Sequence, residues 1–125
     1  MKTLAALFAA SLVIGQALAH GDHEAKHGGF MSRGDELVSA ELVVQKDAIV
    51  MYLETEDGHP LATSGVSGTV TVVAPQRPVQ EAKLVPAGDN KLTASGLKPT
   101  RGDRVNARIR LPSGEEAAIL FSVTR

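Results

Sequence analysis

The sequence has no cysteine and no tryptophan, and only 3% of its 125 residues are aromatic. The absence of cysteine excludes a disulfide scaffold, a zinc finger built on thiolates and thiol catalysis. It also excludes a lipid anchor on an amino-terminal cysteine. The few aromatic side chains count against a surface that stacks on sugars. Without a crosslink, a chain of this size must rely on its hydrophobic core for stability.

The chain also lacks a large excess of either charge, since 13 basic and 14 acidic side chains give a formal net charge of −1. This balance excludes a strongly basic nucleic-acid-binding protein. A hydrophobic fraction of 43% excludes a wholly disordered chain, and no apolar run is long enough for a multi-span membrane protein. The length fits a single domain. No pattern points to turnover, so we do not expect an enzyme.

The amino-terminal residues have the pattern of a secretion signal. Lys2 precedes an apolar stretch over residues 4–14, and Ala17-Leu18-Ala19 matches the small-x-small site of signal peptidase. The apolar stretch is shorter than the ~20 residues that a membrane-spanning helix needs. We therefore predict a signal peptide over residues 1–19, export to a bacterial periplasm, and no membrane span after cleavage.

The mature chain divides into an arm and a domain. Residues 20–34 contain three of the four histidines and four glycines, without apolar periodicity. Such a segment buries too little surface to repay the entropy of ordering it, so we expect a flexible His- and Gly-rich arm. The β-domain is expected to cover residues 35–125.

From residue 35 onward, short β-branched runs alternate with turn signals. Residues 104–111 alternate strictly between apolar and polar side chains, which is typical of a strand with one face in water. The same reasoning predicts strands over 36–44, 48–54, 66–74, 79–85, 91–95, 104–111 and 117–124. About seven short strands without a helical period favour a small antiparallel immunoglobulin-like sandwich. A barrel of five or six strands is the alternative.

The arm carries the candidate chemistry. His20, His23 and His27 lie within eight residues, with Asp22 between the first two. Neutral imidazole is a common ligand of Zn and Cu, and cleavage before His20 would let its α-amine and imidazole chelate one Cu(II) ion. His23, His27 or Asp22 would then complete the coordination. The alternative is a soluble tail whose histidines are incidental.

The methionines and the remaining histidine are expected to have different roles, either as metal ligands or as parts of the fold. Met31 follows His27 by four residues and could add a soft thioether ligand, which favours Cu(I) over Zn(II). Met51 lies within an apolar strand, where filling the core is the usual role of methionine. His59 lies in a Gly-Pro turn, where we expect it to be solvated. The metal is therefore Cu(II), Cu(I) or Zn(II), bound by the arm.

Arginines recur at alternate positions of the strand over residues 104–111. Arg104, Arg108 and Arg110 share its polar face and could meet an anionic surface. A solvent-exposed strand face explains them equally well.

Several short segments together resemble a known family. They are HGG at 27–29, ELV at 36–38, VMYL at 50–53, DGHPL at 57–61, GVSGTVTV at 65–72 and LVPAGDNKL at 84–92. This layout, over most of residues 27–123, resembles small periplasmic β-domain proteins associated with bacterial efflux systems for copper or for cobalt, zinc and cadmium. The resemblance implies an all-β fold, a periplasmic location and an efflux-system protein as partner. A looser likeness to periplasmic copper-resistance carriers implies that His20 is a Cu(II) ligand.

These observations lead to two functional hypotheses. The first is a periplasmic protein that binds Cu or Zn through its arm and buffers the ion or delivers it to an efflux system. Its affinity should fall below about pH 6, where imidazoles protonate. The second is an interaction module without metal, which joins an envelope or efflux assembly through an exposed strand edge.

Overall fold

The protein is built from antiparallel β-strands. The computed structural model describes residues 24–34 and 37–125, and this part of the chain contains nine strands and no helix. The strands are β1 (Phe30–Met31), β2 (Arg33–Gly34), β3 (Val38–Val44), β4 (Ala48–Thr55), β5 (Ser67–Val73), β6 (Gln80–Pro86), β7 (Lys91–Ser95), β8 (Arg104–Arg110) and β9 (Glu116–Ser122). Within these ranges there is accordingly no apolar helix of membrane-spanning length.

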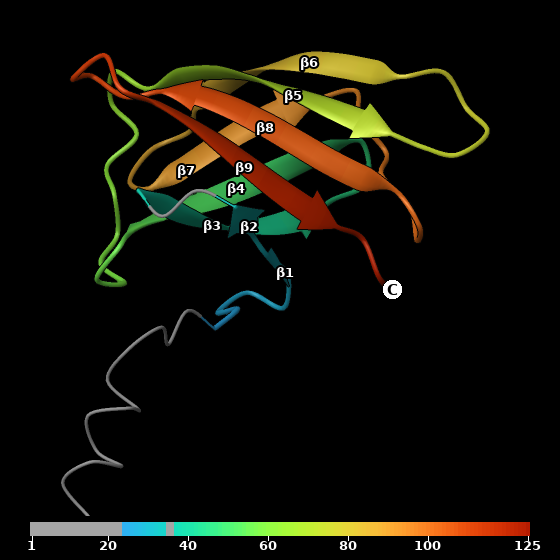
Figure 1. The fold of residues 1–125 in the computed structure, drawn as a ribbon, viewed down its shortest axis with the longest axis horizontal. Coiled ribbons are helices and arrows are strands. Elements are labelled where there is room, and N and C mark those ends of the chain that lie inside the picture. The colour runs from blue at the N-terminus through green and yellow to red at the C-terminus, as the bar shows by residue number, and fades with distance from the viewer. Residues whose placement is uncertain (1–23, 35–36) are drawn as a thin grey trace, which may run out of the picture.

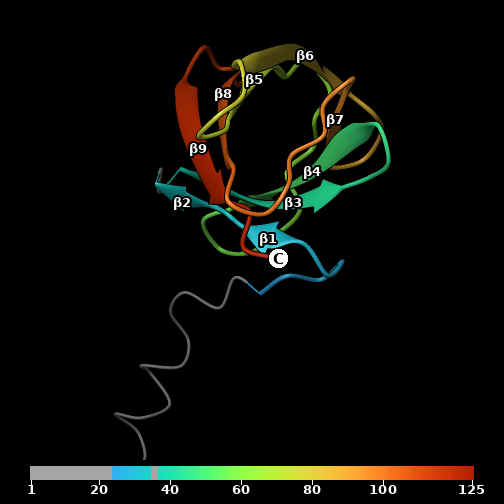
Figure 2. The same cartoon turned by 90° about the vertical axis from the view of Figure 1, so that its right-hand side faces the viewer.

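The strands follow one another in a single hydrogen-bonded order, β1-β3-β4-β7-β6-β5-β8-β9-β2 (Figure 1). The two ends of this order, β1 and β2, are consecutive in the chain and separated only by Ser32. The segment 30–34 therefore pairs with β3 at one end and with β9 at the other. As the view in Figure 2 shows, the sheet curls into a nearly closed barrel, with this segment bridging its first and last long strands.

The prediction of an all-β antiparallel domain is confirmed, and the seven expected strands correspond to β3–β9. The immunoglobulin-like sandwich is not observed. Residues 80–84 of β6 pair with β5, whereas Val85 and Pro86 pair with β7, so β6 links what would otherwise be two sheets. Alternating polarity predicts that a strand has a buried face, but it does not say which neighbour each end will pair with. The alternative prediction, a barrel of five or six strands, has too few strands. The observed barrel has eight when residues 30–34 are counted as one interrupted strand.

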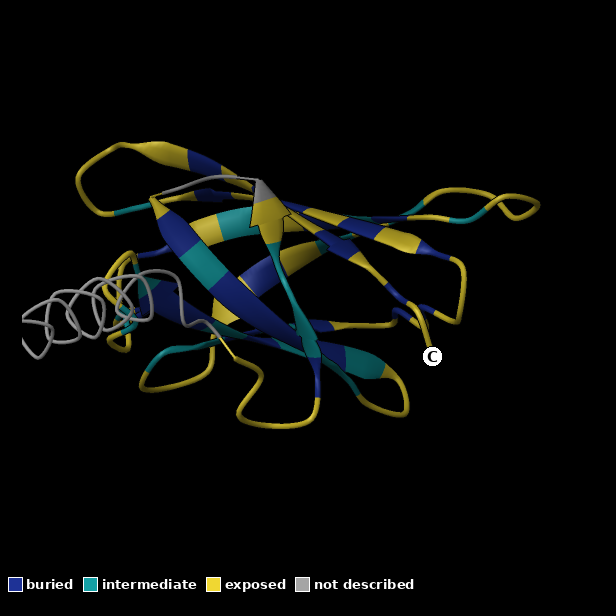
Figure 3. Cartoon of the chain, turned by 60° about the horizontal axis from the view of Figure 1, so that its bottom comes forward, coloured by how far each residue is buried: buried dark blue, intermediate teal, exposed yellow. Residues whose placement is uncertain are grey.

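The core fills the inside of the barrel with side chains from every long strand. Figure 3 shows the buried and exposed residues alternating along the strands, as a period of two requires. β8 buries Val105, Ala107 and Ile109, and β9 buries Ala117, Ile119 and Phe121. Met51 is fully buried in this core, as expected for a residue within an apolar strand.

The barrel begins earlier in the chain than the expected boundary at residue 35. Residues 30–31 and 33–34 are already strands, and Ser32 donates its backbone N–H to the carbonyl oxygen of Ala40 at 2.9 Å. Strands of two residues are too short to show a period, which is why the composition of 20–34 predicted an arm. Within that arm, residues 24–34 are described, whereas 20–23 lie outside the described residues, as do the predicted signal peptide and residues 35–36.

A buried carboxylate fixes two loops to each other. Asp103 is 3% exposed and accepts hydrogen bonds from the backbone N–H of Thr100, at 2.9 Å, and from the guanidinium of Arg77. Burial by itself would raise the pKa of Asp103, but the bonds from Thr100 and Arg77 outweigh it, and this pKa lies below its usual range. The β5–β6 loop is thereby fixed to the loop that precedes β8.

Substitutions at two neighbouring residues of β9 test whether one side chain lies in the core and the other on the surface. We expect Phe121→Ala to lower the free energy of unfolding by about 3–5 kcal/mol, because it leaves a cavity in the core. Leu120→Ala is the matched control, since Leu120 is 42% exposed on the outer face of the same strand. Its cost should stay within about 0.5 kcal/mol. Urea denaturation measures both, and equal costs would contradict the burial pattern.

Candidate metal-binding site

Three strands place a row of side chains on the outer face of the barrel. Met31 of β1 is the register partner of Glu41 of β3, and Glu41 is the partner of Tyr52 of β4. The neighbours of Glu41 in β3, Ala40 and Leu42, belong to the core, so Glu41 points outward. Directly opposed residues on one sheet face have Cβ atoms about 4.5–5.5 Å apart. Met31, Glu41 and Tyr52 are therefore immediate neighbours.

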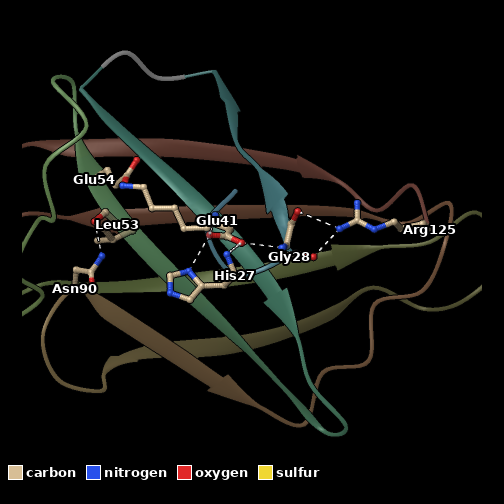
Figure 4. A network of polar contacts seen from close by, with 9 residues as sticks. His27, Gly28, Glu41, Leu53, Glu54, Asn90 and Arg125 are labelled. Atoms are coloured by element: carbon tan, nitrogen blue, oxygen red, sulfur yellow. Dashed lines mark hydrogen bonds and ion pairs between the residues drawn. The ribbon is translucent and has the colours of Figure 1, made fainter. Parts of the chain in front are cut away.

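Glu41 points outward but is only 4% exposed, because residues 26–29 lie over it. Its carboxylate accepts the backbone N–H groups of Lys26 at 2.9 Å, His27 at 2.8 Å and Gly29 at 2.7 Å. It is also bonded to Nδ1 of His27 at 2.9 Å (Figure 4). Burial by itself would raise the pKa of Glu41, but these hydrogen bonds more than compensate and hold this pKa below its usual value. Glu41 is therefore a buried, charged anchor for the segment before β1.

Glycine at position 29 makes this docking possible. A Cβ atom added to Gly29 would lie 2.2 Å from the carbonyl oxygen of Leu42 in β3, so the two backbones approach too closely for any side chain. Gly28 has a positive φ of 72°, in the left-handed region that glycine favours. The two glycines thus fit the segment against the sheet.

Arg125 holds the same segment from another side. Its guanidinium donates to the carbonyl oxygens of Gly28 at 2.6 Å and Gly29 at 3.3 Å (Figure 4). It also lies 4.6 Å from the centre of the Phe30 ring, within the range of a cation–π contact. The N–H groups of the segment thus point to a carboxylate and its carbonyl groups to a guanidinium.

The imidazole of His27 is fixed in place by two contacts. It stacks on the ring of Tyr52 with 3.7 Å between ring centres and 5° between planes. Its Nδ1 faces Glu41, and since an ionised carboxylate only accepts hydrogen bonds, Nδ1 carries the proton and donates it. Nε2 has no hydrogen-bond partner within the described part of the chain. With 43% of its side chain exposed, His27 can offer this nitrogen to a ligand from solution.

A hollow of about 190 Å³ lies beside this imidazole. It is lined by Glu24, Lys26, His27, Met31, Glu41, Tyr52, Glu54, Pro60 and Asn90. Two of its carboxylates are already engaged, because Glu54 accepts the ammonium of Lys26 at 2.7 Å and Glu41 is saturated by the segment above it. The ammonium of Lys26 beside Glu54 has its pKa raised by that hydrogen bond. The donors left toward the hollow include the carboxylate of Glu24, the imidazole of His27 and the thioether of Met31.

The predicted ligands divide between two parts of the chain. His27 and Met31 line one hollow, whereas His20, Asp22 and His23 lie outside the described residues. Across residues 24–34 and 37–125, no three side chains of His, Cys, Asp or Glu are grouped so that they could hold an ion. His59 is exposed in its turn and does not line the hollow, although its neighbour Pro60 does.

Sequence reasoning missed the partners that orient His27. Glu41 interrupts an apolar strand, and Tyr52 is the single tyrosine of the chain. An isolated acid between core residues is the signal that could have indicated Glu41, since such a group needs a specific partner. Nothing in the sequence pairs it with His27, because the two come together through docking and strand register.

Comparison of the chain with family models, with curated proteins and with solved structures finds no match.

The anchor at Glu41 should make the protein sensitive to acid. Because its pKa is lower in the folded state, its contribution to stability is complete above the usual value of 4.5 and is lost as the pH falls through the folded-state pKa. We expect Glu41→Gln to lower the free energy of unfolding by about 1–3 kcal/mol at neutral pH. Its stability should also decline less steeply than that of the wild type as the pH falls.

Urea denaturation from about pH 7 to about pH 2 measures this difference. Some decline should persist in Glu41→Gln, because Asp103 also has a lowered pKa. Asp57→Asn, in an exposed turn, is the control and should follow the wild type. A pH profile of Glu41→Gln parallel to that of the wild type would contradict the role of Glu41.

Proposed function

We propose that this is an exported protein that binds Cu or Zn, with His27 as the ligand that the barrel holds in place. The observation that carries the proposal is the hydrogen bond from Nδ1 of His27 to Glu41. Histidines that ligate metals commonly donate their other ring N–H to a carboxylate, which fixes the tautomer and raises the basicity of the ligating nitrogen. Nε2 of His27 is the nitrogen prepared in this way.

A single imidazole does not retain a transition metal, so the remaining ligands must come from nearby. Met31 lines the same hollow and would add a thioether. His20, Asp22 and His23 precede His27 by four to seven residues and would supply imidazole and carboxylate ligands. A mature chain beginning at His20 would also bring its α-amine. In this arrangement the barrel presents His27 and Met31, and the segment before His27 completes the coordination.

The proposed role is to buffer the ion or deliver it to an efflux-system protein in the periplasm. The predicted signal peptide and the resemblance to proteins of heavy-metal efflux systems support this location and partner. Ligand exchange suits a carrier, because neutral imidazoles bind metal in competition with protons and release it as they protonate. No catalytic step is required.

The alternative, an interaction module that adds a strand to a partner, has less support. That mode needs a long exposed strand edge. The terminal strands of the sheet, β1 and β2, each have two residues and are joined through Ser32, so neither terminal strand offers a long edge. Residues 80–84 of β6, which pair with β5 on one side only, are the stretch that this alternative would use.

Metal titration of paired histidine variants tests the proposal. In native mass spectrometry and calorimetry, the exported protein should bind one Cu(II) or Zn(II) ion at stoichiometric metal. His27→Gln keeps a side chain that can bond to Glu41 and should weaken binding by at least about tenfold. His59→Gln removes one exposed imidazole from a turn and should leave the affinity unchanged.

Two further measurements sharpen the test. Glu41→Gln should weaken binding by about 10–100-fold, as expected for a group that orients a ligand. Affinity should also be lower at about pH 5 than at about pH 7.5, because imidazoles protonate in this range. Equal losses in His27→Gln and His59→Gln, equal affinity at both pH values, or no bound metal would each rule out the proposal.

A further inference from the structure

A second surface, on the other half of the barrel, is rich in basic side chains. Strands β6, β5, β8 and β9, with β2 beyond them, turn their polar residues outward. We call this surface the basic face. Its cations are Arg33, Lys83, Arg104, Arg108 and Arg110, and its carboxylates are Glu81 and Glu116.

Strand register arranges these side chains in rows across the face. In one row, Thr69 of β5 lies between Lys83 of β6 and Arg108 of β8. In the next row, Asn106 of β8 is opposite Leu120 of β9, which is in turn opposite Arg33 of β2. Uncharged side chains therefore separate the cations of this face.

Most of these cations have no ionic partner among the described residues. Arg110 bonds to Glu116 at 2.8 Å, whereas Arg33, Lys83, Arg104 and Arg108 form no ion pair with any described residue. Other exposed cations of the barrel do have partners, as in the pairs Lys26–Glu54, Lys98–Asp47 and Arg77–Asp103. The positive charge of the basic face is thus left available, although the whole chain has a net charge of −1.

The centre of the basic face is hollowed. A depression of about 360 Å³ is lined by Thr69, Thr71, Glu81, Asn106, Ala107, Arg108, Ala118 and Leu120. The hydroxyls of Thr69 and Thr71 and the amide of Asn106 make no side-chain hydrogen bond within the described residues. These groups can therefore bond to the backbone of an incoming chain.

We propose that the basic face docks an extended acidic segment of another protein. Outward residues of β8 repeat every second position, about 7 Å apart, which is also the spacing of alternate side chains on an extended chain. An extended segment with acids at alternate positions can therefore align carboxylates with Arg104 and Arg108, which lie on the same face of β8, and the depression gives room for its backbone. This proposal is independent of the proposed metal site.

Two features favour a polypeptide over an anionic membrane. Glu81 puts a carboxylate in the depression, which repels any anion placed there, whether a phosphate headgroup or an acidic side chain, but can accept an N–H from a peptide backbone. Binding at a membrane interface also draws on apolar and aromatic side chains. Leu120 is the one large apolar side chain that lines the depression, and no described aromatic ring does.

Fluorescence anisotropy with defined peptides tests the proposal. The full protein should bind a labelled decapeptide of alternating Glu and Thr, with an affinity that falls as salt is raised. A decapeptide of alternating Lys and Thr should not bind. The double variant Arg104→Glu/Arg108→Glu should weaken binding by at least about tenfold.

The matched control changes the same charge elsewhere. Lys46→Glu/Lys98→Glu alters two exposed lysines at the β3–β4 turn and the loop beside it, away from the basic face. It should change affinity by less than about twofold. Thermal unfolding of Arg104→Glu/Arg108→Glu should match the wild type, because both arginines are exposed and form no ion pair with a described residue. The control variant loses the exposed Lys98–Asp47 pair, and such surface pairs contribute little to stability, so its unfolding should change only slightly.

Several results would overturn the proposal. Equal weakening in the two double variants would show that affinity follows net charge alone. Absence of binding to the acidic peptide, or equal binding of the basic peptide, would exclude an acidic segment as the partner. Tighter binding to vesicles containing anionic phospholipid, lost in Arg104→Glu/Arg108→Glu, would assign the face to a membrane instead.

Discussion

The carboxylate of Glu41 lies on the outer face of β3 yet is removed from water by residues 26–29. A charge in this position is costly unless it is fully hydrogen-bonded. Three backbone N–H groups and one imidazole meet that need, all from the same four-residue segment. The docking of that segment, the path of the chain into β1 and the orientation of His27 therefore depend on one side chain.

The same contacts stabilise the barrel and orient the candidate metal ligand. The segment that satisfies Glu41 leads directly into β1 and β2, which bridge β3 and β9. It also carries His27 onto the ring of Tyr52. A change that weakens the anchor should therefore loosen barrel closure and release the imidazole together. Thermodynamic measurements on Glu41 variants have to separate these effects, and His27→Gln allows this because it removes the imidazole but keeps a side chain that can bond to Glu41.

The long strands could be predicted because alternation shows directly in the sequence, most clearly where Arg104 to Arg110 alternate with core residues. The closure of the barrel could not be predicted, because β1 and β2 contain only two residues each and show no alternation of polar and apolar side chains. The pairing of β6 with both β5 and β7 could not be predicted for a different reason. Residues 80–86 form one uninterrupted strand in the sequence pattern, which does not show where the strand changes its partner. In the candidate site, His27 and Met31 could be singled out by residue type. Glu41 and Tyr52 could not be singled out, because they come together with His27 through tertiary docking and not through their spacing along the chain. The metal ligands themselves remain a prediction.

The bridge formed by residues 30–34 has a consequence for how the barrel can open. Its pairing with β3 is close in sequence, whereas its pairing with β9 joins distant parts of the chain, since Arg33 lies opposite Leu120. Contacts of such long range carry a high entropic cost of loop closure, and they are expected to form after the local hairpins. A barrel in which the bridge has detached would have two unsatisfied edges, on β3 and β9, each already matched to the sequence of the missing segment. The same segment of a second molecule would fit those edges equally well, so this topology predicts strand exchange between copies as a route of misassembly.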